Sequence, residues 1–213
     1  MTGITIIGSG NMARGIGTRA VAAGAALQII DRDGVHAQLL ASELAPATAG
    51  TLGDVFTGDI VVLALPYDAA REVVTQHADA LAGKIIVDIT NPIDFSTFDA
   101  LVVEPGTSAA EELSTLAPAS ADVVKAFNTT FAGTLVAGEV KGIPLDVMIA
   151  GDDADARAAV AEFVTASGMH PVDVGPLRRA RELEAFQLLV MTLQANPDAT
   201  AFNWDSGLKL LAA

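Results

Sequence analysis

An apolar run at residues 4–7 stops at a glycine, and a helical pattern starts a few residues later. The break between them reads G-x-G-x-x-A, formed by Gly8, Gly10 and Ala13. Gly8 permits a tight turn, Gly10 lets the backbone approach a pyrophosphate, and Ala13 lets the helix lie close to the strand. The start of such a helix offers unpaired N–H groups and a partial positive charge. The pattern therefore predicts a phosphate-binding turn.

A glycine-rich turn of this kind can also be purely structural, so its surroundings matter. The helix expected at residues 12–23 ends before Gly24, which suits a C-cap, and a second strand follows at 27–30. Asp31 comes next, about twenty residues after the turn, where dinucleotide-binding folds place the acid that reads the ribose. We therefore expect Asp31 and Arg32 at the adenosine ribose. The pyrophosphate is expected against Gly8, Ser9, Gly10, Asn11, Met12 and Ala13.

Composition limits the fold class and the partners. Of the 213 residues, 51% are hydrophobic and only 5% aromatic, which suits helices packed on a parallel sheet. The formal net charge of −14 argues against nucleic acid or an anionic membrane as a partner. There is no cysteine, so disulfides, thiolate metal sites and a Cys nucleophile are excluded, and no metal site is expected. Without a basic leader or an apolar run of about 18 residues, we expect a cytoplasmic protein.

Strands and helices alternate along the chain. Strands are expected at residues 4–7, 27–30, 59–66, 84–89, 122–127, 145–150 and 171–174, and helices at 12–23, 35–44, 68–82, 108–117, 153–167 and 178–194. Residues 45–51 are expected to form a loop, and 52–55 a short helical turn or a small strand. The short connections predict an α/β fold, a Rossmann-type doubly wound and mainly parallel sheet. One NAD(P)-binding domain would span residues 1–213 and end in a βαβα extension.

The carboxyl ends of the predicted parallel strands are the expected ligand-binding edge. Beyond the phosphate turn and Asp31, these ends carry Leu65, Pro66, Asn91 and Asn128. One dinucleotide could reach all of them, and these four residues would line its nicotinamide half. For Pro66 and Asn91, a plain structural loop is an equal alternative.

The residues that would distinguish NAD from NADP disagree. Asp31 would accept hydrogen bonds from a free ribose diol and repel a 2′-phosphate, which favours NAD. Arg32 could hold a 2′-phosphate or stack on adenine, and a protonated His36 could assist it. Alternatively, Arg32 is a solvated charge that pairs with Asp33 or Glu43. The cofactor is therefore NADP or NAD.

No catalytic residue is indicated. His77 is expected to face solvent and His170 to be structural. No Ser-His-Asp group, metal-spaced histidine pair or isolated carboxylate pair stands out. This inventory suits hydride transfer, in which the protein mainly positions two cofactors.

A basic cluster begins the last predicted helix. It consists of Arg178, Arg179 and Arg181. These arginines would either anchor an anionic substrate or second cofactor, or pair with Glu182, Glu184 and the acidic surface. Both interpretations stay open.

Several stretches, in this order, resemble the family of coenzyme F420-dependent NADP oxidoreductases and the related cytosolic domain of the STEAP metalloreductases. They are IGSGNM from Ile7, LP at Leu65, KAFNT from Lys125, AGDD from Ala150 and PVDVGPL from Pro171. The likeness covers nearly the whole chain. It implies NAD(P)H at the strand ends, a deazaflavin (F420) or a flavin stacked on the nicotinamide as second cofactor, and a homodimer.

The sequence departs from that family at two places. Where the F420 enzymes carry a Ser-Arg pair for the 2′-phosphate, this chain has Asp31 and Arg32. Where they have a histidine near the deazaflavin, it has Asn128, as the metalloreductase branch does. The phosphate turn also looks like that of pyrroline-5-carboxylate reductase and the 3-hydroxyacid dehydrogenases. Those families need a large helical second domain, whereas this chain stays βαβ-like.

We therefore expect an oxidoreductase that transfers hydride between NAD(P)H and F420 or a flavin. One alternative is a non-catalytic NAD(P)H-binding redox sensor, which the lack of a catalytic acid or base supports. Another is a reductase of a small imine or carbonyl substrate without a second cofactor. In each case the partners are small molecules.

Overall fold

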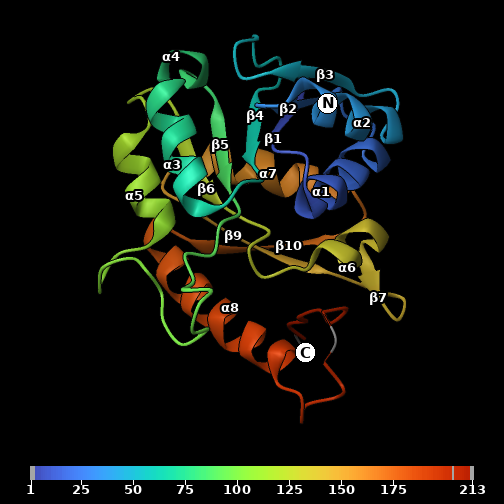
Figure 1. The fold of residues 1–213 in the computed structure, drawn as a ribbon, viewed down its shortest axis with the longest axis vertical. Helices are drawn as coiled ribbons and strands as arrows, with labels where there is room; N and C mark the ends of the chain where they lie inside the picture. The colour runs from blue at the N-terminus through green and yellow to red at the C-terminus, as the bar shows by residue number, and fades with distance from the viewer. Residues whose placement is uncertain (1–2, 203, 212–213) are drawn as a thin grey trace.

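The computed structural model describes residues 3–202 and 204–211, and the other positions of the predicted 1–213 domain lie outside the described residues. Its main sheet contains eight strands: β1 (Ile4–Ile7), β2 (Leu27–Asp31), β3 (Thr48–Thr51), β4 (Ile60–Leu63), β5 (Ile85–Asp88), β6 (Asp122–Lys125), β9 (Asp146–Gly151) and β10 (His170–Gly175). Their order across the sheet is β10-β9-β6-β5-β4-β1-β2-β3 (Figure 1).

Strand direction divides this sheet into two parts. The strands β1 to β6 are all parallel to one another. Strand β9 pairs antiparallel with β6, and β10 continues parallel to β9. The Rossmann-type, mainly parallel sheet in a single domain is thus confirmed. The late strands extend the same sheet with reversed direction.

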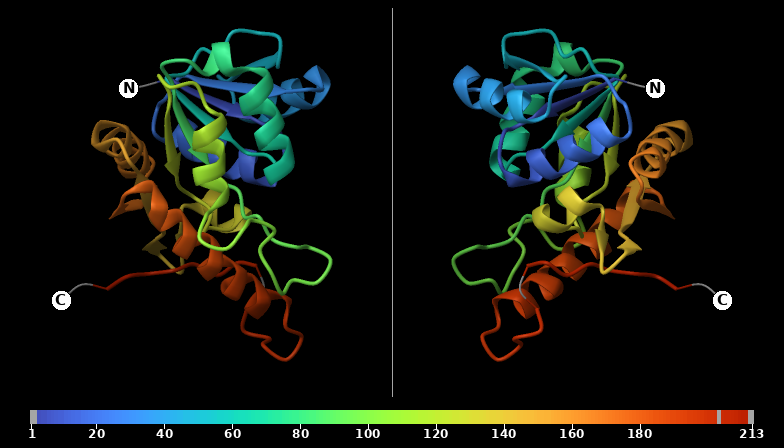
Figure 2. Two further views of the ribbon diagram at one scale, coloured as in Figure 1. Left: turned by 90° about the vertical axis from the view of Figure 1, so that its left-hand side faces the viewer. Right: turned by 90° about the vertical axis from the view of Figure 1, so that its right-hand side faces the viewer.

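Helices cover both faces of the sheet (Figures 1 and 2). One face packs against α1 (Asn11–Ala22), α2 (Gly34–Glu43), α6 (Ala132–Ala137) and α7 (Ala154–Ala166). The other packs against α3 (Tyr67–Gln76), α4 (Ala78–Leu81), α5 (Ala109–Leu116) and the start of α8 (Ala180–Ala195). Successive side chains of a strand point to opposite faces of the sheet, so Ile6 belongs to the first apolar cluster and Ile7 to the second.

Helix α8 leaves the body of the domain. Figure 2 shows its C-terminal half extending away from the sheet. The following segment is attached through Asp146, whose carboxylate accepts hydrogen bonds from the Leu210 N–H at 2.7 Å and the Lys209 Nζ at 2.5 Å. None of the helices in the described ranges has the length and apolar character needed to cross a membrane.

Three local predictions were wrong. The loop expected at 45–51 contains β3, whereas residues 52–54 form a turn. The hydrophobic pattern of residues 48–51 is weak because β3 is an edge strand that pairs only with β2. The single helix expected at 68–82 is divided into α3 and α4 at His77, which has non-helical φ/ψ. The His77 ring is half-buried near Phe56, with the ring centroids 6.2 Å apart, rather than solvent-facing.

Short elements between the regular ones were not predicted. They are α6, the hairpin of β7 (Glu139–Val140) and β8 (Ile143–Pro144), and a 3₁₀ turn η1 (Leu177–Arg179) before α8. Each is shorter than the window in which hydrophobic periodicity is informative.

Candidate cofactor site

The phosphate turn has the steric design that its glycines predict. Gly8 has a φ of +114°, and a Cβ there would collide with the carbonyl oxygen of Ala64. Gly10 has an ordinary φ of −78°, and a Cβ there would meet no atom within 4 Å. Ala13 is fully buried on the inner face of α1. Glycine is therefore needed at position 8 for packing, whereas at position 10 it leaves space open.

Helix α1 begins at this open space. Gly10 is its N-cap, no side chain caps its first turn, and that turn contains no acidic residue. The first N–H groups of the helix and its partial positive charge are therefore free to act on an anion. A phosphate at this position needs no additional protein charge.

Asp31 is held beside the turn. The Ser9 Oγ donates to Asp31 Oδ2 at 2.6 Å, and the Asp33 N–H donates to Oδ1 at 3.0 Å. Arg32 lies in the same cleft wall. Of its two expected partners, Glu43 pairs instead with Arg14 at 2.8 Å. If Arg32 is a solvated charge that pairs with a nearby acid, Asp33 is therefore the expected partner that remains.

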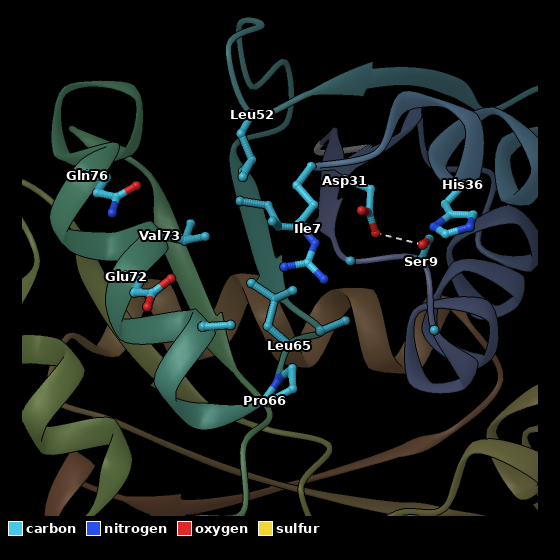
Figure 3. Close-up of a pocket in the computed structure, with 15 residues that line it drawn as sticks. Ile7, Ser9, Asp31, His36, Leu52, Leu65, Pro66, Glu72, Val73 and Gln76 are labelled. Atoms are coloured by element: carbon cyan, nitrogen blue, oxygen red, sulfur yellow. Dashed lines mark hydrogen bonds between the residues drawn. The ribbon is translucent and has the colours of Figure 1, made fainter.

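These groups line a first cleft of about 430 Å³. Its phosphate side is formed by Gly8, Ser9, Gly10, Asp31, Arg32 and His36. Its opposite wall comes from α3, where Glu72, Val73 and Gln76 face Asp31 and His36 across the cleft (Figure 3). The sequence analysis missed this wall, although the spacing of 69, 72, 73 and 76 puts these residues on one helical face.

A second cleft of about 570 Å³ adjoins the first. Gly10, Leu65 and Pro66 line both clefts, so the two form one groove along the carboxyl ends of the strands. Asn11 and Met12 line the second cleft at the start of α1. Tyr67, Thr90 and Pro92, at the predicted strand ends, line it as well. Further residues that the sequence analysis did not assign to the site complete it: Ala64, Asp68, Ile89, Ile93, Asp94, Phe95, Val102 and Met191.

The two predicted asparagines meet but occupy different layers. Asn91 lines the second cleft, and its Nδ2 donates to the Asn128 carbonyl at 3.0 Å. The Asn128 Nδ2 donates back to Asn91 Oδ1 at 3.0 Å and to the Leu183 carbonyl at 3.2 Å. Asn128 is only 1% exposed because α8 covers it. It does not line the cleft as predicted but fixes the amide of Asn91 from behind.

A buried charge cluster lies beneath this part of the groove. The Lys125 Nζ donates to Asp88 Oδ2 at 2.7 Å, to Glu184 Oε1 at 2.7 Å and to the Thr90 carbonyl at 2.6 Å. The side chains of Lys125, Asp88 and Glu184 are completely buried. Burial alone would lower the pKa of Lys125, but the two carboxylates outweigh it and raise that pKa. The lysine therefore stays charged and ties β5, β6 and α8 together.

One interpretation of the arginine cluster paired the arginines with Glu184, but among the described residues Glu184 forms no ion pair with them. Burial raises its pKa, and the N–H groups of Ala109 and Ala110 at the start of α5 donate to its carboxylate. The signal in the sequence was Lys125, a charge inside an apolar strand, which must find a buried partner.

Two of the three clustered arginines form surface ion pairs. Arg179 contacts Glu182 at 2.6 Å, as one interpretation expected, and Arg181 contacts Glu111 on α5 at 2.6 Å. None of the three arginines lines either cleft. The anchor for an anionic substrate is therefore not supported at this helix.

Tyr67 is a partly buried titratable side chain of the second cleft. Burial raises its pKa, and its hydroxyl donates to Glu112. A phenol with a raised pKa stays protonated at neutral pH, and here its O–H is directed at Glu112 rather than into the cleft.

The sequence and the fold of this chain are similar to those of known proteins. Residues 3–92 match the family model described as NADP oxidoreductase, coenzyme F420-dependent. The chain is 34% identical over 188 residues to metalloreductase STEAP3 of Rattus norvegicus. The aligned region covers 88% of this chain and 37% of that protein. The part of the chain from residue 3 to residue 92 is therefore similar to the F420-dependent NADP oxidoreductase family. The predicted resemblance is thus confirmed, and the chain spans about two fifths of the length of the rat relative.

Two further similar proteins match this chain over most of their length. The F420-dependent NADP reductase of Methanocaldococcus jannaschii is 28% identical over 176 residues, covering 81% of this chain and 75% of that one. A crystal structure from Arthrobacter sp. FB24, provisionally named as an F420-dependent NADP reductase, superposes with a TM-score of 0.80 and 27% identity. The match covers 92% of this chain and 94% of the Arthrobacter chain.

Proposed function

We propose that this protein transfers hydride between a nicotinamide dinucleotide bound along the groove and an organic acceptor in the second cleft. The observation that carries the proposal is the continuity of the two clefts over Gly10 and the uncapped start of α1. The open Cβ position of Gly10 is the space that a pyrophosphate needs. The match of residues 3–92 to an NADP oxidoreductase family model supports the same cofactor class.

The residues of the groove divide the binding task. The turn from Gly8 to Ala13 would hold the pyrophosphate, and Asp31, Arg32 and the α3 wall would hold adenosine. Leu65, Pro66 and Asn91 would hold the nicotinamide half. Because Asn128 uses one N–H and one lone pair of the Asn91 amide, that amide is fixed and retains one of each for a ligand.

The chemistry belongs to the bound molecules. NAD(P)H supplies the hydride, and the acceptor takes one further proton from solvent, so that two electrons and two hydrogens are transferred in all. The chain supplies position and a partly apolar surrounding, through Leu65, Pro66 and Ile89. A deazaflavin such as F420 or a flavin is the proposed acceptor class. The homodimer and the cytoplasmic location stay predictions from the sequence.

The first test is a titration of the pure protein with NADPH and NADH, followed by F420, FMN and FAD, with nicotinamide absorbance as the readout. We expect saturable binding of a nicotinamide cofactor and its oxidation by at least one acceptor. Tight binding without turnover of any acceptor would favour the redox sensor instead. Turnover only with a small imine or carbonyl compound would favour the third interpretation.

Cofactor preference is tested at Asp31. We expect Asp31→Ser to raise the affinity for NADPH relative to NADH by about tenfold, because a carboxylate that opposes the 2′-phosphate is removed while Arg32 and His36 remain. The matched control is Asp33→Ser, which removes a charge two residues away, outside the first cleft, and keeps a residue able to cap α2. An unchanged ratio in Asp31→Ser would show that Asp31 does not face the ribose.

A further inference from the structure

The two clefts of the groove differ in charge. The first contains Arg32 and His36 besides its acidic groups. Among the described residues that line the second cleft, none is Lys, Arg or His, and two are acidic, Asp68 and Asp94. Cationic side chains therefore stand at one end of the groove only, where a dinucleotide carries its adenosine.

One of the two acidic groups of the second cleft is held in the ionised state by its own loop. Asp94 accepts hydrogen bonds from the Ser96 N–H at 2.9 Å, the Ser96 hydroxyl at 2.5 Å and the Thr97 hydroxyl at 2.9 Å. These bonds lower the pKa of Asp94, and its carboxylate remains charged at neutral pH. Asp68 lies in the first turn of α3, where it offsets the partial positive charge of that helix end.

The two guanidinium groups beside this cleft do not change this balance, because each is already opposed by an acid. Arg14, whose Nη1 donates to Asn11 Oδ1 at 3.4 Å, pairs with Glu43 at 2.8 Å. Arg71 lies over the Tyr67 ring, 5.6 Å from its centroid, and 4.0 Å from the Glu112 carboxylate. It therefore stands behind Tyr67, already opposed by an acid, and is not part of the cleft wall. The remaining wall is largely apolar: Met12, Ile89, Ile93, Phe95, Val102 and Met191.

We propose that the second cleft selects a planar acceptor that is uncharged or cationic and disfavours acceptors with anionic side chains. An anion in this cleft meets Asp68 and Asp94 without a compensating cation, whereas a neutral ring gains the apolar walls. This inference rests on the proposed function, because it concerns the acceptor of the same groove. It predicts that, among the deazaflavin and flavin candidates, those with fewer negative charges bind more tightly.

The experiment compares ligands that differ mainly in charge. Riboflavin is paired with FMN, which adds a phosphate, and the uncharged deazaflavin riboside precursor of F420 is paired with F420, which adds a phosphodiester and carboxylates. Dissociation constants are measured by ligand fluorescence with the whole chain, with and without saturating NADPH, at low and high salt. We expect the uncharged member of each pair to bind about tenfold more tightly at low salt and the difference to shrink at high salt.

Two variants assign this difference to the cleft. In Asp68→Asn with Asp94→Asn, the preference within each pair is expected to fall to about twofold at low salt. Because Asp94 also holds its own loop, Asp68→Asn alone is measured too and is expected to give part of the effect. The charge-matched control is Asp79→Asn with Asp155→Asn, two exposed positions outside the cleft, which should keep the wild-type preference.

The outcomes separate this inference from the proposed function. Equal or tighter binding of FMN and F420, a preference that the two variants leave unchanged, or failure of both uncharged ligands to bind would overturn the charge selection. NADPH binding followed by oxidation with F420 as the best acceptor would do the same while leaving hydride transfer intact. Absence of binding by both NADPH and NADH would instead overturn the proposed function, whatever the flavins do.

Discussion

Replacing Gly10 by valine is expected to abolish binding of both NADPH and NADH while the chain still folds. A Cβ at Gly10 points into open space, so the added side chain meets no protein atom. That space lies at the start of α1, where the pyrophosphate must approach the free N–H groups. We expect affinity to fall by at least about 100-fold, which corresponds to about 2.7 kcal/mol.

The same geometry predicts only a small effect on folding. Gly10 has an ordinary φ, and an N-cap valine is less favourable than glycine by about 1 kcal/mol or less. A matched control is Gly53→Val, because a Cβ at Gly53 also meets nothing within 4 Å and Gly53 lies outside both clefts. Calorimetric titration with NADPH gives the affinity, and chemical denaturation gives the free energy of unfolding. Wild-type affinity in Gly10→Val would refute the placement of the pyrophosphate.

How far the sequence predicts this site depends on how local each part is. The phosphate turn and Asp31 lie within one βαβ unit, where steric rules fix residue type at fixed spacing. The structure therefore brings Ser9, Gly10 and Asp31 together as expected. Leu65, Pro66 and Asn91 were found in the groove because parallel strands end at a common edge.

The parts that were missed depend on contacts between distant segments. Met191 reaches the second cleft from α8, about 100 residues after the loop that carries Phe95, and no local pattern specifies that contact. Asn128 follows β6 as predicted, but α8 covers it and places it behind Asn91. Helical periodicity finds the face of α3 that carries Val73, yet cannot show that this face closes a cleft.

Replacing Lys125 by methionine is expected to destabilise the fold by about 3–5 kcal/mol, because it leaves two carboxylates buried without their cation. Asp88 and Glu184 have no exposed surface through which water can replace the lysine. The change is measured as the free energy of unfolding at pH 7 by chemical denaturation. Lys141→Met, at an exposed hairpin position, is the control and should stay within about 0.5 kcal/mol of wild type.

A second set of variants distinguishes lost charge compensation from a simple packing defect. Adding Asp88→Asn and Glu184→Gln to Lys125→Met removes both uncompensated charges and should recover part of the lost stability. Lys125→Met alone should also approach wild-type stability as the pH falls. Burial raises the pKa of Glu184 already in the wild type. A carboxyl group whose pKa is higher in the folded state than in the unfolded state destabilises the fold only when the pH rises above its unfolded-state pKa, so acid removes this destabilisation. A stability loss that neither acid nor the added substitutions reduce would show that Lys125 contributes through packing rather than charge.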